Sequence, residues 1–205
     1  MKRVTTMTSD GAGAGALQDS TAWKRALRRE MAARRRALTP AEHARLSECI
    51  VGHLLAALPA AAGGVVGFCW PIKHEPDVRA ALAAWQAAGS RAALPVVVAA
   101  DAPLAFRHWQ SDTCLVADRY GIPTPAEGDW LTPDILLLPL NAFDGAGYRL
   151  GYGGGYFDRT LAALRPRPLA VGVGFEMNRV DSIRPEAHDQ RLDWIVTEAG
   201  AVRVA

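Results

Sequence analysis

A glycine-rich segment at residues 144–159 carries the residue types best suited to holding phosphate groups. Its sequence is DGAGYRLGYGGGYFDR, with six glycines among residues 145–155. Glycines let backbone N–H groups converge on an anion, and a helix that starts after them adds unpaired donors and a positive dipole end. Arg149 can add a bidentate cationic contact. The segment predicts a phosphate site, although glycine content alone is explained about equally well by a flexible turn.

The segment matches neither of two common nucleotide motifs. It lacks the Gly-Lys-Ser/Thr of a Walker loop, and Tyr156 occupies the sixth place counted from Gly151, where a dinucleotide fingerprint has glycine. Asp158 falls in the first turn of the expected helix, where it complements the helix dipole or, beside a triphosphate, binds Mg²⁺. Asp193 is a candidate second carboxylate, but its spacing is no better than that of Asp181 or Asp189.

Positive charge is concentrated near the start of the chain. Residues 21–36 hold seven basic side chains against Glu30, whereas the whole chain has a net charge of only +2. Such a helix suits nucleic acid, a membrane surface or a polyanionic small molecule. Lys24 and Arg28 are one helical turn apart and share a face. We expect Arg29 and residues 34–36 to form a solvated surface.

Hydrophobic periodicity predicts the elements that position these residues. Trp23, Leu27 and Met31 repeat every four residues in a helix over 22–37, and a capping box begun by Thr39 precedes a second helix. Further helices are expected at 76–88 and 156–164. Buried or short strands are expected at 65–70, 92–98, 104–109, 113–116, 135–138, 169–173, 194–197 and 202–204, with a loop at 120–132. Pro95 weakens one of these strand assignments.

Alternating strands and helices predict an α/β fold of three layers: a mostly parallel sheet with helices on both faces, preceded by an N-terminal helical pair. We expect residues 1–20 to be a flexible leader and residues 21–205 to form one domain. The chain is half hydrophobic, and its mean hydropathy of +0.02 is typical of a globular protein. We expect a cytoplasmic protein, because no stretch has the length of a membrane span or the pattern of a secretory signal. The three cysteines have no C-x-x-C spacing and are expected to be free thiols.

The segment PLNAFD followed by RLGYGGGYFDR, at residues 139–144 and 149–159, resembles the signature of the 5-formyltetrahydrofolate cyclo-ligase family, also called methenyltetrahydrofolate synthetases. Other pieces follow in the expected order: KRALR at 24–28, EPD at 75–77, GIP at 121–123 and the stretch 189–193. The resemblance covers residues 22–197.

The resemblance implies the ATP- and Mg²⁺-dependent cyclisation of 5-formyltetrahydrofolate to 5,10-methenyltetrahydrofolate through a phosphorylated formyl group. It implies catalytic roles for Arg149 and Lys24, folate contacts for Glu75 and Trp70, and Mg²⁺ ligands in Asp158 and Asp193. It also implies a small-molecule substrate, no nucleic-acid or membrane partner, and a monomer. The implied nucleotide contacts are Lys24, Arg25, Arg28, Arg149, Leu150, Gly151, Tyr152, Gly153, Gly154, Gly155, Tyr156 and Phe157.

Three departures from the family pattern are visible, of which one is the extra leader at the start of the chain. Phe157 stands where many members have a second tyrosine, and Leu140-Asn141 replaces a glycine-containing pair. Two other functions remain open: a nucleic-acid-binding module that uses the basic helix and ignores ATP, and an ATP-independent sugar-phosphate isomerase or CoA-transferase relative.

Overall fold

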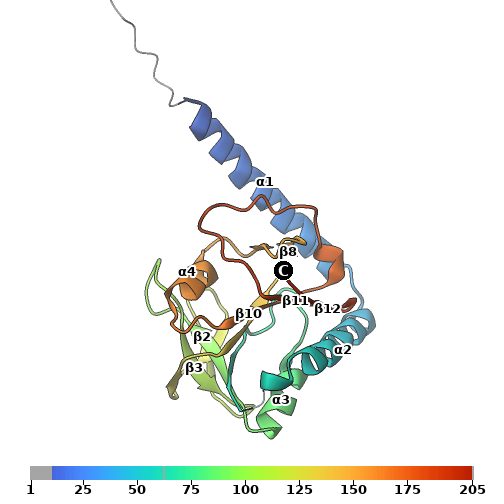
Figure 1. Ribbon diagram of the computed structural model, residues 1–205, viewed down its shortest axis with the longest axis vertical. Coiled ribbons are helices and arrows are strands. Elements are labelled where there is room, and N and C mark those ends of the chain that lie inside the picture. The colour runs from blue at the N-terminus through green and yellow to red at the C-terminus, as the bar shows by residue number, and fades with distance from the viewer. Residues whose placement is uncertain (1–10, 62, 205) are drawn as a thin grey trace, which may run out of the picture.

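A computed structural model describes residues 11–61 and 63–204 (Figure 1). Its central feature is an eight-stranded sheet in the order β12-β11-β10-β7-β1-β2-β3-β6. The five strands β11, β10, β7, β1 and β2 run parallel, and antiparallel pairings add β12 on one side and β3 and β6 on the other. The strand bounds are β1 Val65–Gly67, β2 Arg91–Val96, β3 Ala105–Trp109, β6 Trp130–Leu131, β7 Ile135–Pro139, β10 Leu169–Val173, β11 Trp194–Thr197 and β12 Gly200–Arg203.

Side chains of β7 alternate between two hydrophobic clusters, as expected for a strand buried on both faces. Ile135 and Leu137 belong to the cluster under helices α2 (Pro40–Ala57) and α3 (Arg79–Ala87), while Leu136 and Leu138 belong to the cluster under α4 (Tyr156–Ala163). Helices therefore cover both faces of the sheet, and the predicted three-layer α/β architecture is confirmed (Figure 1).

Helix α1 (Gly11–Arg36) starts well before the predicted residue 22. Half of the segment expected as a flexible leader therefore continues the helix, and the other half, residues 1–10, lies outside the described residues. Alanine-rich sequence has high helix propensity, and adding a turn to a formed helix costs little. The predicted packing stripe is confirmed, because Leu27 and Met31 are buried and Trp23 is half-buried against them.

The predicted capping box at the start of α2 is present. The Glu42 amide donates to the Thr39 hydroxyl, and the Glu42 carboxylate accepts from the Thr39 amide. The strand predicted at 92–98 is confirmed as β2, which contains Pro95 even though proline has no N–H to donate. The expected loop at 120–132 contains β6 and also β5 (Pro123–Pro125), which pairs with β4 (Leu115–Ala117).

Within the described residues no helix is both long and apolar enough to cross a membrane. Cys49, Cys69 and Cys114 are free thiols, as predicted.

Candidate functional site

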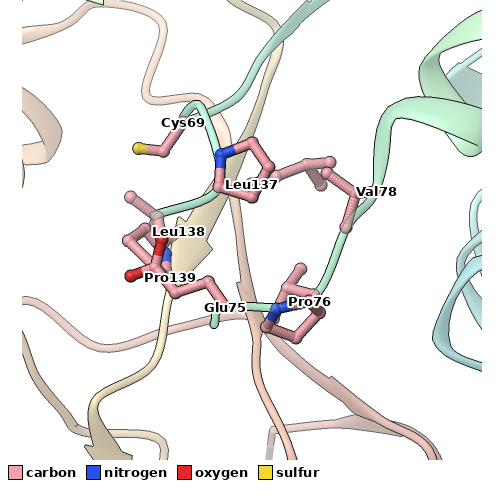
Figure 2. Close-up of a pocket in the computed structure, with 9 residues that line it drawn as sticks. Cys69, Glu75, Pro76, Val78, Leu137, Leu138 and Pro139 are labelled. Atoms are coloured by element: carbon pink, nitrogen blue, oxygen red, sulfur yellow. The ribbon is translucent and has the colours of Figure 1, made fainter. Parts of the chain in front are cut away.

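A partly open pocket lies at the carboxyl ends of the parallel strands, where open α/β sheets usually bind ligands (Figure 2). Its volume is about 300 Å³ with solvent-facing space included. The loop after β1 forms one wall, and the ends of β7 and β10 form the other. The residues labelled in Figure 2 are Cys69, Glu75, Pro76, Val78, Leu137, Leu138 and Pro139.

Glu75 is the carboxylate of this otherwise apolar pocket and is only 6% exposed. Its Oε2 accepts the Ile72 amide at 3.0 Å, and its Oε1 accepts the Tyr152 hydroxyl. Burial raises the pKa of Glu75, while the hydrogen bonds and the positive charge of Arg35 act in the opposite direction. A buried carboxylate with a perturbed pKa at a pocket is typical of a binding or catalytic residue.

The glycine-rich segment lies next to Glu75, because Tyr152 belongs to it. The segment connects β8 (Ala142–Phe143) to β9 (Arg149–Leu150), the two strands of a short hairpin, and then forms the loop that leads into α4. Gly153 and Gly155 have φ of +100° and +64°, conformations that other residues rarely adopt. The loop is therefore a specific turn, and Tyr152 within it bonds to Glu75 of the pocket.

Helix α1 crosses this loop, as expected if the basic helix folds over a ligand there. The Arg28 Nε donates to the Gly151 carbonyl at 2.7 Å. Lys24 is only 12% exposed and forms an ion pair with Glu186 at 2.7 Å, whereas Arg25 is exposed. Lys24 and Arg28 thus lie beside the loop, and no contact of Arg25 with the loop is observed within the described residues.

Arg149 does not extend into open space, as a phosphate contact would require. It is 7% exposed, and its guanidinium donates to the Asp158 carboxylate at 3.0 Å and to the Gln190 carbonyl at 2.9 Å. Burial lowers the pKa of Arg149, and Asp158 and Asp189 oppose that shift. In this arrangement Arg149 links β9 to Asp158 at the start of α4 and to Gln190.

Asp158 and Asp193, the expected pair of metal ligands, have different partners. Asp158 Oδ1 accepts from Arg149 and from the Gln190 amide. Asp193 lies at the amino end of β11, where its Oδ2 accepts from Arg167 and from the Ala170 amide. Asp189, which spacing did not distinguish from Asp193, precedes Gln190, and its charge acts on Arg149, the partner of Asp158. Its Oδ2 accepts the Glu186 amide at 2.7 Å and lies 3.9 Å from the Lys24 ammonium. No group of three or more His, Cys, Asp or Glu side chains suited to a metal occurs among the described residues.

Several side chains of the signature pack rather than line an open site. Leu150 is 3% exposed in the cluster under α1, and Phe157 packs against the cluster under α4. The Tyr156 hydroxyl lies 3.0 Å from that of Tyr120. Trp70 packs edge-on against Trp109, outside the pocket lining. Any nucleotide contact at Leu150 and Phe157 would therefore come from their backbone.

Two polar residues near the site were missed from the sequence. Arg35, expected on a solvated surface, is 1% exposed, and its Nη2 donates at 2.9 Å to Oδ1 of Asn141, which is 2% exposed. Arg35 follows Met31 by four residues, so the stripe that begins at Trp23 could have indicated its burial. Asn141 belongs to the departure from the family pattern, and its pairing with Arg35 gives that departure a structural role.

Comparisons with known proteins agree on one family. The model of the 5-formyltetrahydrofolate cyclo-ligase family matches residues 20–198. The 5-formyltetrahydrofolate cyclo-ligase of Escherichia coli K12 is 30% identical over 171 residues, which span 80% of this chain and 94% of the relative. That of Mycolicibacterium smegmatis is 31% identical over 137 residues, covering 62% and 70% of the two chains.

Solved structures show the same relationship. The 5,10-methenyltetrahydrofolate synthetase of Aquifex aeolicus superposes with a TM-score of 0.75 at 31% identity, covering 88% of this chain and 92% of the other. The enzyme of the same name from Mycoplasma pneumoniae gives 0.70 at 27% identity, with coverages of 85% and 98%. The chain therefore belongs to the 5-formyltetrahydrofolate cyclo-ligase family and is an enzyme of folate one-carbon metabolism.

Proposed function

We propose that the protein uses ATP to convert 5-formyltetrahydrofolate into 5,10-methenyltetrahydrofolate, with release of ADP and phosphate. The observation that carries this proposal is the hydrogen bond between Tyr152 and Glu75. It joins the glycine loop, suited to phosphates, to the buried carboxylate of the pocket at the ends of β1 and β7. A nucleotide on the loop and a folate at Glu75 would thus be neighbours, as direct phosphoryl transfer between them requires.

The chemical problem is that an amide-like formyl oxygen is a poor leaving group. In the proposed reaction this oxygen attacks the terminal phosphorus of ATP, so that an O–P bond forms and ADP leaves. The N10 lone pair then attacks the activated formyl carbon, the C–O bond breaks with release of phosphate, and N10 loses its proton. No residue has to form a covalent bond to the substrate, so the protein positions the reactants and stabilises charge.

The residues beside the loop suit the phosphate chain. Arg28 holds the Gly151 carbonyl, and Lys24 lies one turn earlier on the same helix. We expect both cations and the amides of residues 151–155 to contact phosphate oxygens. Lys24 would exchange its ion pair with Glu186 for a phosphate. Arg149 would act through Asp158 and Gln190, whose positions it fixes, rather than by direct contact.

Mg²⁺ fits at Asp158 but not at the pair Asp158 and Asp193. Both hydrogen bonds to Asp158 fall on Oδ1, so Oδ2 is the better placed to take a cation. Asp193 is committed to Arg167 and the start of β10. Asp189 suits the second position, because Mg²⁺ takes few protein oxygens and completes its shell with water and phosphate. The bound ion would neutralise phosphate charge.

The experiment is to mix the purified protein with 5-formyltetrahydrofolate, ATP and Mg²⁺ and to follow the near-ultraviolet absorbance of the methenyl product together with ADP. We expect both to appear in equal amounts and only when all three components are present. Methenyl product without ATP would refute the proposal and would favour an ATP-independent enzyme.

A further inference from the structure

A buried polar cluster next to the pocket contains more hydrogen-bonding capacity than the fold uses. Arg35 on α1 and Asn141 after β7 meet through the Nη2–Oδ1 bond, and the Arg35 Nε donates to the Lys73 carbonyl at 3.3 Å. Lys73 is two residues from Glu75, and the charge of Arg35 is felt by both Glu75 and Tyr152. The cluster therefore lies beside Glu75, behind the residues that line the pocket.

Two N–H donors in this cluster are unpartnered within the described residues. They are Nη1 of Arg35 and Nδ2 of Asn141, and both are buried. Leaving a buried donor unsatisfied costs about 1–3 kcal/mol, and more when the group is charged. If the pair served only to attach α1, an apolar contact would do so without this cost. Such exceptions call for a ligand or a water.

The cluster presents a specific pattern of acceptors and donors. Glu75 supplies carboxylate oxygens, one of which now accepts from Tyr152, and Arg35 and Asn141 supply N–H donors. A ring edge that carries N–H groups beside a carbonyl oxygen is complementary to this pattern. The pterin ring of a folate has such an edge, because its pyrimidine bears a 2-amino group, a ring N–H and a 4-oxo group.

We propose that Arg35 and Asn141 donate hydrogen bonds to the 4-oxo group of the pterin ring while Glu75 accepts from its N–H groups. The proposal rests on the proposed function and deepens it, because it names the residues that select a 4-oxo ring over a 4-amino ring. A ring N–H takes the place of the Tyr152 hydroxyl at Glu75. A 4-amino group is itself a donor and would face the N–H donors of Arg35 and Asn141, which is strongly unfavourable.

The competing explanation is a buried water. Asn178 is fully buried, its Oδ1 is also unpartnered within the described residues, and its Nδ2 donates to the Leu140 carbonyl at 3.4 Å. A water that joined Asn178 Oδ1 to Asn141 Nδ2 would satisfy the amides without any substrate. In that case Asn141 would not discriminate between a 4-oxo and a 4-amino group.

The test compares the binding of two matched ligands, 5-formyltetrahydrofolate and its 4-amino-4-deoxy analogue, by titration calorimetry without nucleotide. We expect the wild-type protein to prefer the 4-oxo ligand by roughly 10- to 100-fold. Asn141→Asp keeps the shape and the contact with Arg35 but replaces the Nδ2 donor with an acceptor. We expect this variant to lose the preference or to reverse it. Asn178→Asp, the same change at a neighbouring buried asparagine, should leave the preference unchanged.

A preference unaltered by Asn141→Asp would overturn the inference, as would equal binding of both ligands to the wild type. If Asn141→Asp does not fold, Arg35→Lys provides the second readout, because lysine cannot present the Nη1 donor while holding Asn141. We expect it to lower the preference at least tenfold, and an unchanged preference would again contradict the inference. ATP-dependent turnover by the wild type is measured separately, so failure of this site is distinguishable from failure of the proposed function.

Discussion

Glu75 is a single residue whose ionised form lowers the stability of the folded protein. Burial raises the pKa of this carboxyl above its ordinary value of 4.5. For a carboxyl whose pKa is raised in the folded state, the protonated form is favoured by folding, and that stabilisation is lost as the pH rises through the folded-state pKa. The ionised carboxylate is therefore destabilising near neutral pH, although the proposed contact with the folate requires that form.

Glu75→Gln should consequently increase stability and decrease activity. The amide can accept from Ile72 and donate to the Tyr152 oxygen, so it fits the site without a charge. We expect its free energy of unfolding to exceed that of the wild type at about pH 8 and to match it at about pH 4, by urea denaturation. The kcat/KM for folate should fall roughly 10- to 100-fold, because a charge-assisted hydrogen bond is lost. Lower stability of the variant at the higher pH would contradict this account.

Tyr152→Phe tests the link between the glycine loop and the pocket. The Tyr152 hydroxyl lowers the pKa of Glu75, so its removal should raise that pKa further. The acidic limb of the pH profile of kcat/KM should therefore move to higher pH. The phenyl ring keeps its contact with the Lys73 ammonium, which lies 4.7 Å from the ring centre. Tyr148→Phe in the same segment is the control, and an unmoved limb in Tyr152→Phe would exclude the link.

At this scale the roles of Glu75, Lys24 and Arg28 came from the family resemblance and remain predictions, although the structure places Glu75 at the pocket and Arg28 on the glycine loop. Arg35 and Asn141 were missed. The four-residue stripe of α1 extends to Arg35 and could have indicated its burial, whereas no local pattern predicts its pairing with Asn141. Sequence reasoning also could not choose between Asp189 and Asp193. That choice depends on where the chain turns from α4 towards β11, and tertiary contacts set that turn.

At the scale of elements, the glycine loop has positions that differ in what they tolerate. A methyl group at Gly151 would meet no atom within 4 Å and would need no positive φ, so Gly151→Ala should change the unfolding free energy by less than about 0.5 kcal/mol. Its nucleotide affinity should still fall at least tenfold, because the methyl group would occupy space where phosphate oxygens approach the backbone.

Titration with a non-hydrolysable ATP analogue measures this effect. Gly145→Ala, equally open and also without a positive φ, is the matched control and should bind normally. Unaltered nucleotide affinity in Gly151→Ala would remove the loop from the phosphate site.

Thr39→Ala tests whether α2 acts only as support. Loss of the hydroxyl cap should lower the unfolding free energy by about 1 kcal/mol, as measured by urea denaturation. The value of kcat should not change, because Thr39 lies at the N-terminus of α2 and its hydroxyl bonds to Glu42 of the same helix. Thr132→Ala, an exposed threonine outside the helices, should have little effect on either quantity. A large loss of kcat in Thr39→Ala would show that α2 does more than support the sheet.

Helices and strands that are specified by their own residues were predicted correctly from the sequence. The capping box of α2 and the buried strands β7 and β10 were identified because local chemistry and hydrophobic runs specify them. The short strands β5 and β6 were missed. β5 consists of Pro123–Pro125, which has few strand-forming residues, and β6 has only two residues and pairs with β3, which lies more distant in the sequence. The start of α1 was placed too late, because the glycines that alternate with alanines at its beginning have low helix propensity.

At the scale of the whole molecule, the proposed site is assembled from parts far apart in the sequence. The basic helix α1, the loop after β1 and the glycine loop converge at the carboxyl edge of the sheet. This convergence explains why the positive charge is concentrated in one helix of a chain with a net charge of only +2. In the proposed function the cations serve the phosphate chain where α1 crosses the loop, whereas the rest of the chain is net acidic, because +2 overall less +6 in residues 21–36 leaves −4.

The central claim is that ATP activates the formyl oxygen of the folate, and an isotope measurement tests it most directly. The protein is supplied with ATP, Mg²⁺ and 5-formyltetrahydrofolate that carries a heavy oxygen isotope in the formyl group, and the released phosphate is analysed by mass spectrometry. The account predicts one labelled oxygen in each phosphate formed. Unlabelled phosphate, with the isotope recovered in water, would contradict it.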